Sequence, residues 1–169
     1  MNNVMIDLET LDIKPTAAII SIGAVAFDRN GLGNSFYSIV DGNTSTAAGM
    51  TISQDTINWW KNQSEEAQSI FHSPDKTTIQ NALTAFGQWL PHNCKLWGNG
   101  AAFDNAVLSN AYSVCGMGQP WRFWNDRCYR TLSSFTKNKR VQSGTHHNAL
   151  DDAKSQAQHM IDYMNSYIQ

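Results

Sequence analysis

Apolar and acidic residues alternate near the beginning of the chain. Val4, Ile6 and Leu8 fall on one side of this segment, whereas Asp7 and Glu9 fall on the other. Alternate residues of a strand point to the same face of a sheet. The pattern therefore predicts a strand with one apolar face and one acidic face.

Two further strands are expected to follow the first. The segment 17–28 is rich in Ile, Val and Ala, residues 29–34 include a turn-forming Asn-Gly pair, and residues 35–40 resume an extended pattern. Strands joined by short turns pair antiparallel, so we predict a three-stranded meander. The Gly-, Thr- and Ser-rich stretch 41–49 is expected to be a loop.

Helical spacing of apolar residues dominates the rest of the chain. The segments with this spacing are 54–63, 64–71, 77–90, 103–116 and 148–168. We expect short strands between them, at Leu96-Trp97 and near Trp121 to Asp126. This order predicts an α/β fold, with helices flanking a mixed sheet that combines an antiparallel three-strand meander with parallel strands. We expect one domain over residues 1–169.

Composition excludes several classes of protein. The chain has 169 residues and 41% hydrophobic content, which is enough for one well-covered core. No apolar run approaches the about 18 residues that span a bilayer, and the first residues lack a signal-peptide pattern, so we predict a cytoplasmic protein without membrane contact. Cys94, Cys115 and Cys128 are odd in number and widely spaced, which argues against a disulfide framework.

The charge balance contains one local bias. A net charge of −2 argues against a general polyanion binder. Half of the 12 Lys and Arg residues nevertheless fall in one segment whose only acid is Asp126, namely Arg122, Arg127, Arg130, Lys137, Lys139 and Arg140. This segment fits either contact with a phosphate backbone or a solvated basic loop.

The pair Asp7 and Glu9 has the spacing of a metal site. Their Cα atoms would lie about 6.5 Å apart on one face of a strand, so both carboxylates can reach one hard cation. Exposed strands also carry alternating acids without any metal, and the pair by itself is a weak signal.

A second acid follows the strand predicted at Leu96-Trp97. Gly98 and Gly100 lead into a helix whose first turn carries Asp104. Glycines permit close backbone approach, and ligands of α/β folds commonly bind where a helix begins beyond a strand end. The alternative role of Asp104 is to stabilise the positive end of the helix.

A third acid lies at the beginning of the last predicted helix, where two registers compete. His146 and Asp151 are five residues apart, and so are His147 and Asp152. On a helical wheel Asp152 borders the buried stripe, whereas Asp151 turns toward solvent. We therefore choose Asp152 as the metal ligand and His147 as its partner.

Together, the acids of these three segments fit two-metal hydrolysis of a phosphodiester. Two cations about 4 Å apart hold the attacking and leaving oxygens in such reactions. Carboxylates suit Mg²⁺, with Mn²⁺ as a substitute. His147 has the residue type of a general base near neutral pH.

Several motifs of the chain resemble the DEDDh branch of the DnaQ-like 3′-to-5′ exonucleases, within the ribonuclease H-like superfamily. The first motif corresponds to Asp7-Leu8-Glu9-Thr10 and the second to Phe103-Asp104. The third corresponds to His147-x-Ala149-x-x-Asp152-Ala153. The residues 56–60 and the region of Asp126-Arg127 look most like small bacterial and phage-type exoribonucleases.

The resemblance implies stepwise release of nucleoside 5′-monophosphates from the 3′ end of single-stranded RNA or DNA, or of a 3′ overhang. It implies that Asp7, Glu9 and Asp152 hold one cation, and that Asp7 and Asp104 serve a second. It makes His147 the general base.

Substrate contacts are expected from Thr10, Leu11, Trp60 and Phe103. Leu11-Asp12 departs from the Thr-Gly sequence frequent in the family. Trp59 and Trp60 point about 100° apart on a helix, so one can be buried and the other exposed, and the sequence does not say which. A ribonuclease H-like endonuclease and a non-catalytic nucleic-acid-binding module are the alternatives. The sequence does not decide whether the protein prefers RNA or DNA, or whether it forms a homodimer.

Overall fold

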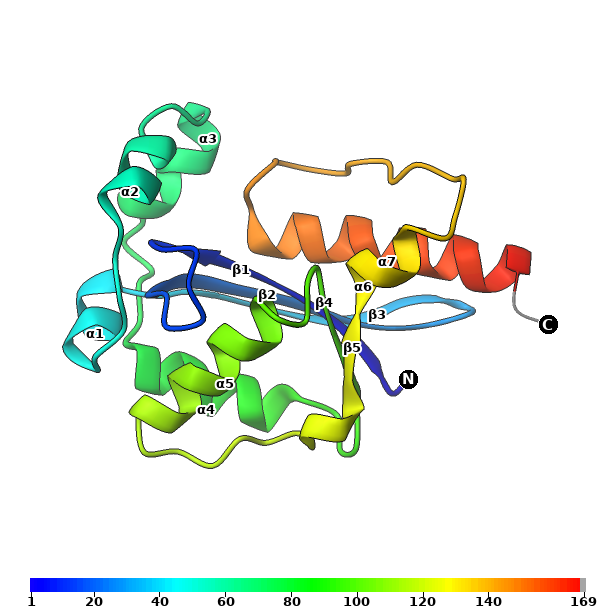
Figure 1. Ribbon diagram of the computed structural model, residues 1–169, viewed down its shortest axis with the longest axis horizontal. Coiled ribbons are helices and arrows are strands. Elements are labelled where there is room, and N and C mark those ends of the chain that lie inside the picture. The colour runs from blue at the N-terminus through cyan, green and yellow to red at the C-terminus, as the bar shows by residue number, and fades with distance from the viewer. Residues whose placement is uncertain (168–169) are drawn as a thin grey trace.

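The computed structural model describes residues 1–167, and its centre is a five-stranded mixed sheet in the order β3-β2-β1-β4-β5 (Figure 1). The antiparallel meander consists of β1 (Asn3–Thr10), β2 (Ile19–Asp28) and β3 (Gly31–Ile39). Strand β4 (Lys95–Gly98) pairs parallel with β1, and β5 (Asp126–Cys128) pairs parallel with β4. The predicted fold class is confirmed.

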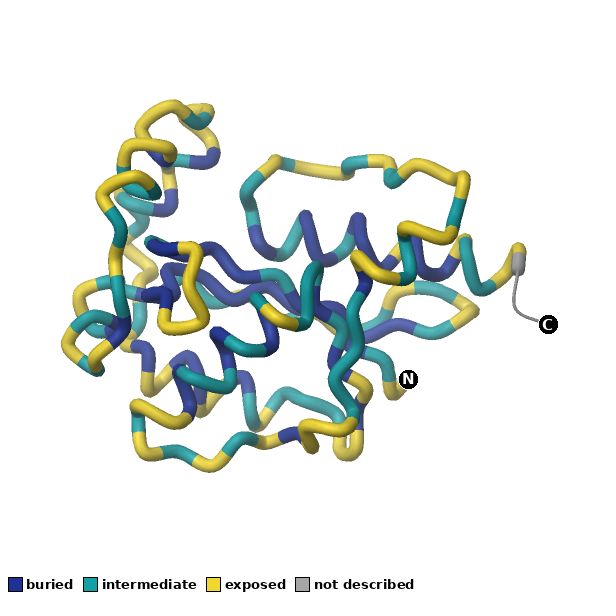
Figure 2. The backbone as a smooth tube through the Cα atoms, in the orientation of Figure 1, coloured by how far each residue is buried: buried dark blue, intermediate teal, exposed yellow. Residues whose placement is uncertain are grey.

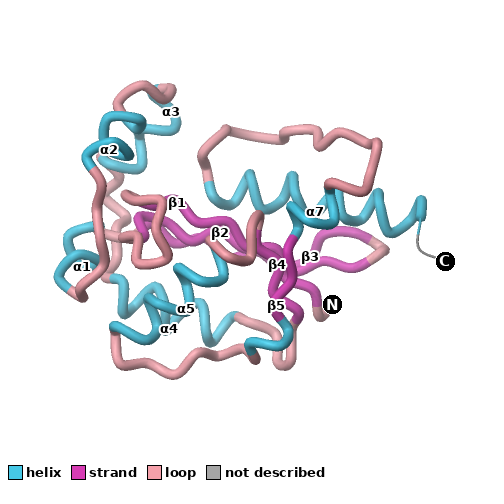
Figure 3. The backbone as a smooth tube through the Cα atoms, viewed as in Figure 1, coloured by secondary structure: helices cyan, strands magenta, loops and turns pink. Residues whose placement is uncertain are grey.

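Helices lie on both faces and at one end of this sheet (Figures 1 and 3). The α-helices are α1 (Gly42–Ala47), α2 (Gln54–Trp60), α3 (Glu65–Gln68), α4 (Ile79–Trp89), α5 (Asp104–Val114), α6 (Tyr129–Ser133) and α7 (Ala149–Tyr167). Two 3-10 turns are η1 (Ser69–Phe71) and η2 (Phe123–Asn125). Residue 168, the predicted end of the last helix, lies outside the described residues.

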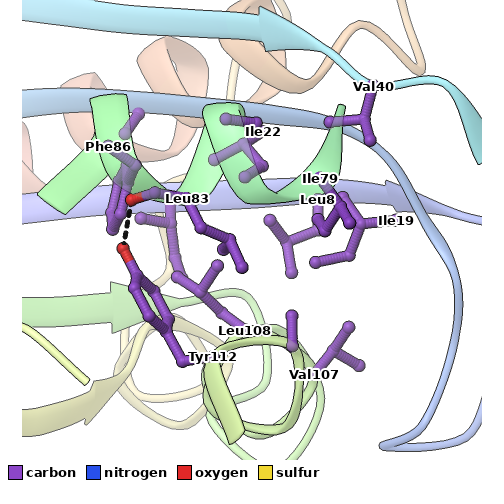
Figure 4. Close-up of a cluster of buried hydrophobic side chains, with 14 of the residues drawn as sticks. Leu8, Ile19, Ile22, Val40, Ile79, Leu83, Phe86, Val107, Leu108 and Tyr112 are labelled. Carbon is purple, nitrogen blue, oxygen red and sulfur yellow. Dashed lines mark hydrogen bonds between the residues drawn. The ribbon is translucent and has the colours of Figure 1, made fainter. Parts of the chain in front are cut away.

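The two faces of β1 belong to two apolar layers. Val4, Ile6 and Leu8 pack in the layer that contains α4 and α5, where the hydroxyl of Tyr112 donates to the carbonyl oxygen of Leu83 at 2.7 Å (Figure 4). Met5 lies on the opposite face, in a second layer with α7. The middle of the sheet is consequently buried between helices (Figure 2). Of the acids of β1, Glu9 is buried and Asp7 is partly buried.

Two predicted elements were wrong. The stretch expected as a loop contains α1, because the Asp41 side chain accepts from the backbone N–H of Asn43 and the Ser45 hydroxyl donates to the Ile19 carbonyl, which together satisfy polar groups that would otherwise favour a loop. The last strand begins at Asp126 rather than near Trp121. The residues before it form η2, so their side chains do not alternate between two faces.

Other boundaries follow from tertiary contacts. Strand β3 begins at Gly31, four residues before the predicted segment, because it pairs with β2 from the turn onward. Within residues 1–167, no helix combines the length and apolar character needed to cross a bilayer. All three cysteines are free thiols.

Candidate active site

Strand β1 presents Asp7 and Glu9 toward α7. Asp7 pairs with Gly23 of β2, and the register shifts just after Glu9. The Gln156 side chain of α7 donates from Nε2 to Asp7 Oδ1 at 2.7 Å. Gln156 is fully buried, so this bond fixes the orientation of the Asp7 carboxylate.

A glycine on β2 lets α7 approach the sheet at this point. A Cβ atom at Gly23 would lie 2.2 Å from the carbonyl carbon of Ala149, the first residue of α7. No real side chain tolerates such a contact with backbone, so the helix can begin here only above a glycine. Asp152, in the first turn of α7, is thereby held beside the β1 acids.

The turn between β4 and α5 supplies Asp104. Its Oδ1 accepts from the backbone N–H of Leu8 at 3.3 Å, so the carboxylate reaches across to β1. A Cβ atom at Gly98 would lie 2.9 Å from Asp104 Cβ, and Gly100 has a φ of +119°, a conformation suited to glycine. Gly98 therefore leaves room for the Asp104 side chain and Gly100 allows the turn, whereas the approach of a ligand to these glycines stays a prediction.

His147 lies just before α7 in a strained conformation. Its φ is +61°, which is uncommon for a residue with a side chain. Its backbone N–H donates to Asp152 Oδ2 at 2.9 Å, which stabilises this conformation. Ligand atoms of Glu9, His147 and Asp152 all lie within 4.8 Å of one another. The carboxylate of Asp151 instead accepts from the backbone N–H of Thr145.

The electrostatic environment disfavours ionisation of Asp7, Glu9 and Asp104. Burial, with repulsion from the neighbouring carboxylates, raises the pKa of Asp7 well above its usual range and that of Glu9 to about 8. Burial raises the pKa of Asp104 to about 7, against backbone hydrogen bonds and Arg130, which lower it. Burial also lowers the pKa of His147, which favours the neutral imidazole.

The donor set fits a hard divalent cation. Oδ1 of Asp152 is buried and has no hydrogen-bond partner among the described residues. Its nearest cation is Arg140, whose Nη2 lies 3.8 Å away. Clustered carboxylates with an unsatisfied oxygen are the chemistry that Mg²⁺ and Mn²⁺ satisfy, because these ions prefer oxygen ligands.

A cavity of about 410 Å³ borders the acids, and its wall contains Glu9, Thr10, Trp59, Trp60 and Phe103. Trp59 is 43% exposed, whereas Trp60 is only 3% exposed and donates from Nε1 to the Thr10 carbonyl oxygen at 2.9 Å. The sequence left this choice open.

Leu11 does not line this cavity, although it was expected to contact substrate. Its side chain packs against the apolar core and borders a separate pocket beside Gly42. Leu11 follows the end of β1 and packs against two apolar clusters, which accounts for its position away from the cavity. Gln156 was not predicted, because an amide on a long amphipathic helix carries no pattern of its own.

Comparison with known proteins identifies the family of this chain. Residues 2–164 match the model of the 3′-5′ exoribonuclease Rv2179c-like domain. An exodeoxyribonuclease of Enterobacteria phage T4 is 27% identical over 160 aligned residues, which cover 78% of this chain and 70% of the relative.

Solved structures share the fold at low sequence identity. The nuclease domain of 3′hExo, described as a DEDDh family member bound to rAMP, has a TM-score of 0.62 and 15% identity over 97% of this chain and 92% of its own. Exonuclease X in complex with 5′ overhanging duplex DNA has a TM-score of 0.60 and 20% identity over 97% of this chain and 92% of its own. Pop2p of S. pombe, in its Mg²⁺- and Mn²⁺-bound form, has a TM-score of 0.62 and 14% identity over 98% of this chain and 84% of its own. Because the family match spans nearly the whole length, the chain belongs to the family of 3′-5′ exoribonuclease Rv2179c-like domains and is a 3′-5′ exonuclease.

Proposed function

We propose that this enzyme uses two divalent cations, Mg²⁺ or Mn²⁺, to release nucleoside 5′-monophosphates from the 3′ end of single-stranded nucleic acid or of a 3′ overhang. The observation that carries the proposal is the convergence of four carboxylates from β1, α5 and α7 next to His147. Such a cluster is unfavourable without cations, because like charges in a buried site repel each other.

The proposal assigns a role to each acid. Asp7, Glu9 and Asp152 would hold one cation, and Asp7 with Asp104 would serve the second. Bound cations would stabilise the charge that develops on the attacking and leaving oxygens and would lower the pKa of a bound water. Gln156 keeps one oxygen of Asp7 hydrogen-bonded, so it orients the carboxylate that both cations would share.

His147 would take the proton from the attacking water. Its lowered pKa keeps the ring neutral and able to accept a proton near pH 7. Its ring lies 4.8 Å from that of Trp59 in an edge-to-face arrangement, and this contact with the hydrogen bond to Asp152 holds it over the site.

The cavity beside the acids would receive the terminal nucleotide. Trp59 offers the exposed ring there, and Phe103, Thr10 and Glu9 line the same cavity. Trp60 supports this wall from the core through its bond to Thr10, and Leu11 lies behind it. We therefore assign direct contact to Thr10, Trp59 and Phe103, with Trp60 and Leu11 as support.

Substrate preference is to be measured with one panel. The family description names RNA and the phage T4 relative is named for DNA. Single-stranded RNA, single-stranded DNA and 3′-overhang duplexes, each labelled at the 5′ end, should shorten one nucleotide at a time with Mg²⁺ and stay intact with EDTA. Products should be nucleoside 5′-monophosphates, and Asp7→Asn should abolish trimming. Cleavage of circular substrates would point to an endonuclease and contradict the proposal.

The adjacent residues His146 and His147 provide a matched test of the general base. His147→Ala should lower kcat by roughly 100-fold or more and remove the acidic limb of the pH profile. His146→Ala should leave kcat nearly unchanged and keep the acidic limb, with its midpoint moved slightly upward, because His146 is exposed and its charge lowers the pKa of His147. Similar losses in both variants would assign the effect to the loop rather than to proton transfer.

A further inference from the structure

The surface at the beginning of β5 carries aromatic rings that the active site does not use. Phe123 is 72% exposed and Trp124 is 58% exposed, with ring centroids 5.0 Å apart at 82°. The guanidinium carbon of Arg122 lies 5.2 Å from the centre of a Trp124 ring. We call these three residues the aromatic platform. It borders a cavity of about 550 Å³ that His92 and Gln119 also line.

The backbone of the aromatic platform is held rigidly. Trp121, immediately before it, is buried against Tyr112 and donates from Nε1 to Asp126 Oδ1 at 2.8 Å. Asn105 of α5 donates to the same oxygen at 2.8 Å. The exposure of Phe123 and Trp124 is therefore built into the fold, and adjacent large exposed rings are typical of a binding surface.

Two of the arginines near the aromatic platform have no carboxylate within ion-pair distance. Within residues 1–167, Arg140 and Asp152 form the one ion pair. Arg122 and Arg127 are therefore not paired with a carboxylate, whereas the charge of Arg130 acts on Asp104. Unpaired guanidinium groups beside exposed rings complement a polyanion whose bases can stack.

These arginines lie along an edge that leads to the active site. Strand β5 is the edge strand and runs parallel to β4, whose carboxyl end leads to Asp104 (Figure 1). The guanidinium carbon of Arg130 lies 3.6 Å from the Cβ position of Gly100, in the turn before Asp104. Arg127 lies on β5 between Arg130 and the aromatic platform. The basic residues thus mark a continuous path from the acids to the aromatic rings.

We propose that the aromatic platform binds bases of single-stranded nucleic acid on the 5′ side of the end being trimmed, with Arg127 and Arg130 beside the intervening phosphates. This rests on the proposed function. From Trp124 to Arg130 the chain spans at most about 20 Å. A stacked strand rises about 3.4 Å per nucleotide, so about six nucleotides are enough to cover this span, and we expect a strand of 3 nucleotides to end before the aromatic platform.

Substrate length is the variable that tests this surface. KM and kcat are measured with Mg²⁺ for single strands of 3 and of 15 nucleotides, in RNA and in DNA, with the wild type, Trp124→Ala and Phe123→Ala. We expect each substitution to raise KM roughly tenfold for the 15-mer, the size of one lost stacking contact, and to leave the 3-mer unchanged. Phe135→Ala is the control, because this ring is 75% exposed but lies outside the aromatic platform.

Salt dependence tests the phosphate contact separately. Arg127→Ala should reduce the slope of log Kd against log salt by about one for the 15-mer, measured as binding in EDTA. Arg29→Ala, an exposed arginine in the turn between β2 and β3, should not change the slope.

The outcomes are distinguishable. Equal KM changes at both lengths, or none at either, would overturn the role of the aromatic platform while leaving the exonuclease intact. A wild type that trims neither length would contradict the proposed function instead. A change in sedimentation of Trp124→Ala without a length effect would make the aromatic platform a self-association surface and overturn the proposal.

Discussion

The acid cluster and the β5 edge place opposite charges in opposite physical settings. The acids at the junction of β1, α5 and α7 are buried close together, so each raises the free energy of ionising the next. The arginines of the β5 edge lie largely at the surface, where water and ions screen them. Tertiary packing is required to hold the acids together, whereas the arginines need few packing contacts to keep their positions at the surface. A buried cluster of this kind costs stability that a cation would recover.

The support for the acid cluster comes from close packing at glycines. Gly23 allows α7 to begin against β2, and Gly98 leaves room for the Asp104 side chain. The β5 edge depends instead on a few hydrogen bonds around Asp126. Substitutions should therefore affect the two regions very differently.

The largest expected effect distinguishes the two adjacent aspartates of α7. Asp152→Asn should lower kcat by at least roughly 100-fold, because it removes a charged metal ligand. Asp151→Asn should retain most activity, since an amide oxygen can still accept from Thr145. The measurement is initial trimming rate at saturating Mg²⁺. A larger loss in the Asp151 variant would reverse the assigned register.

Close packing beside the acids should be the next most sensitive feature. Gly23→Ala should lower the free energy of unfolding by about 1–3 kcal/mol, because the new methyl group meets the Ala149 backbone. Displacement of α7 should also lower the trimming rate. Gly118→Ala is the control, since its Cβ position is open. Urea unfolding in EDTA measures the first effect, and equal stability of both variants would be inconsistent with it.

The pH dependence of metal-free stability tests the cost of the acid cluster. The pKa of Glu9 rises from 4.5 when exposed to about 8 in the folded protein, so folding favours its protonated form. This contribution is fully present below pH 4.5 and is lost as pH rises through about 8. In EDTA the thermal midpoint should therefore fall over this range.

Glu9→Gln provides the comparison for that measurement. Its midpoint in EDTA should fall less steeply with pH, and Mn²⁺ should stabilise it less than the wild type, even though its trimming activity is lost. Glu65→Gln, at the start of α3, should follow the wild type. A steeper fall in the Glu9 variant would mean that another group dominates the pH dependence.

The smallest expected effect concerns the wall of the nucleotide cavity. Trp60→Phe removes the donor to the Thr10 carbonyl and should cost about 1 kcal/mol of unfolding free energy. Trp59→Phe should change stability by less, because its ring is partly exposed, and should act mainly on KM. The reverse pattern would exchange the roles of these tryptophans.

Local patterns predicted most of the secondary structure. Alternation identified β1, and helical spacing identified α4, α5 and α7, because those patterns repeat over several turns or residues. The helix α1 was missed because its polar residues are satisfied by Asp41 and Ile19, contacts that composition does not reveal. The segment before β5 was misjudged because short aromatic runs fit either a strand or a turn.

The sequence by itself pointed to the candidate acids and to His147 with Asp152, because these depend on spacing within single segments, and it predicted the mixed-sheet fold from the order of those segments. Only the tertiary structure decided which tryptophan is exposed, that Leu11 turns into the core, and that Gln156 orients Asp7. Those outcomes depend on which distant segment packs against each side chain. Residues far apart in the chain meet only when the sheet and helices are assembled, and no local pattern encodes that contact.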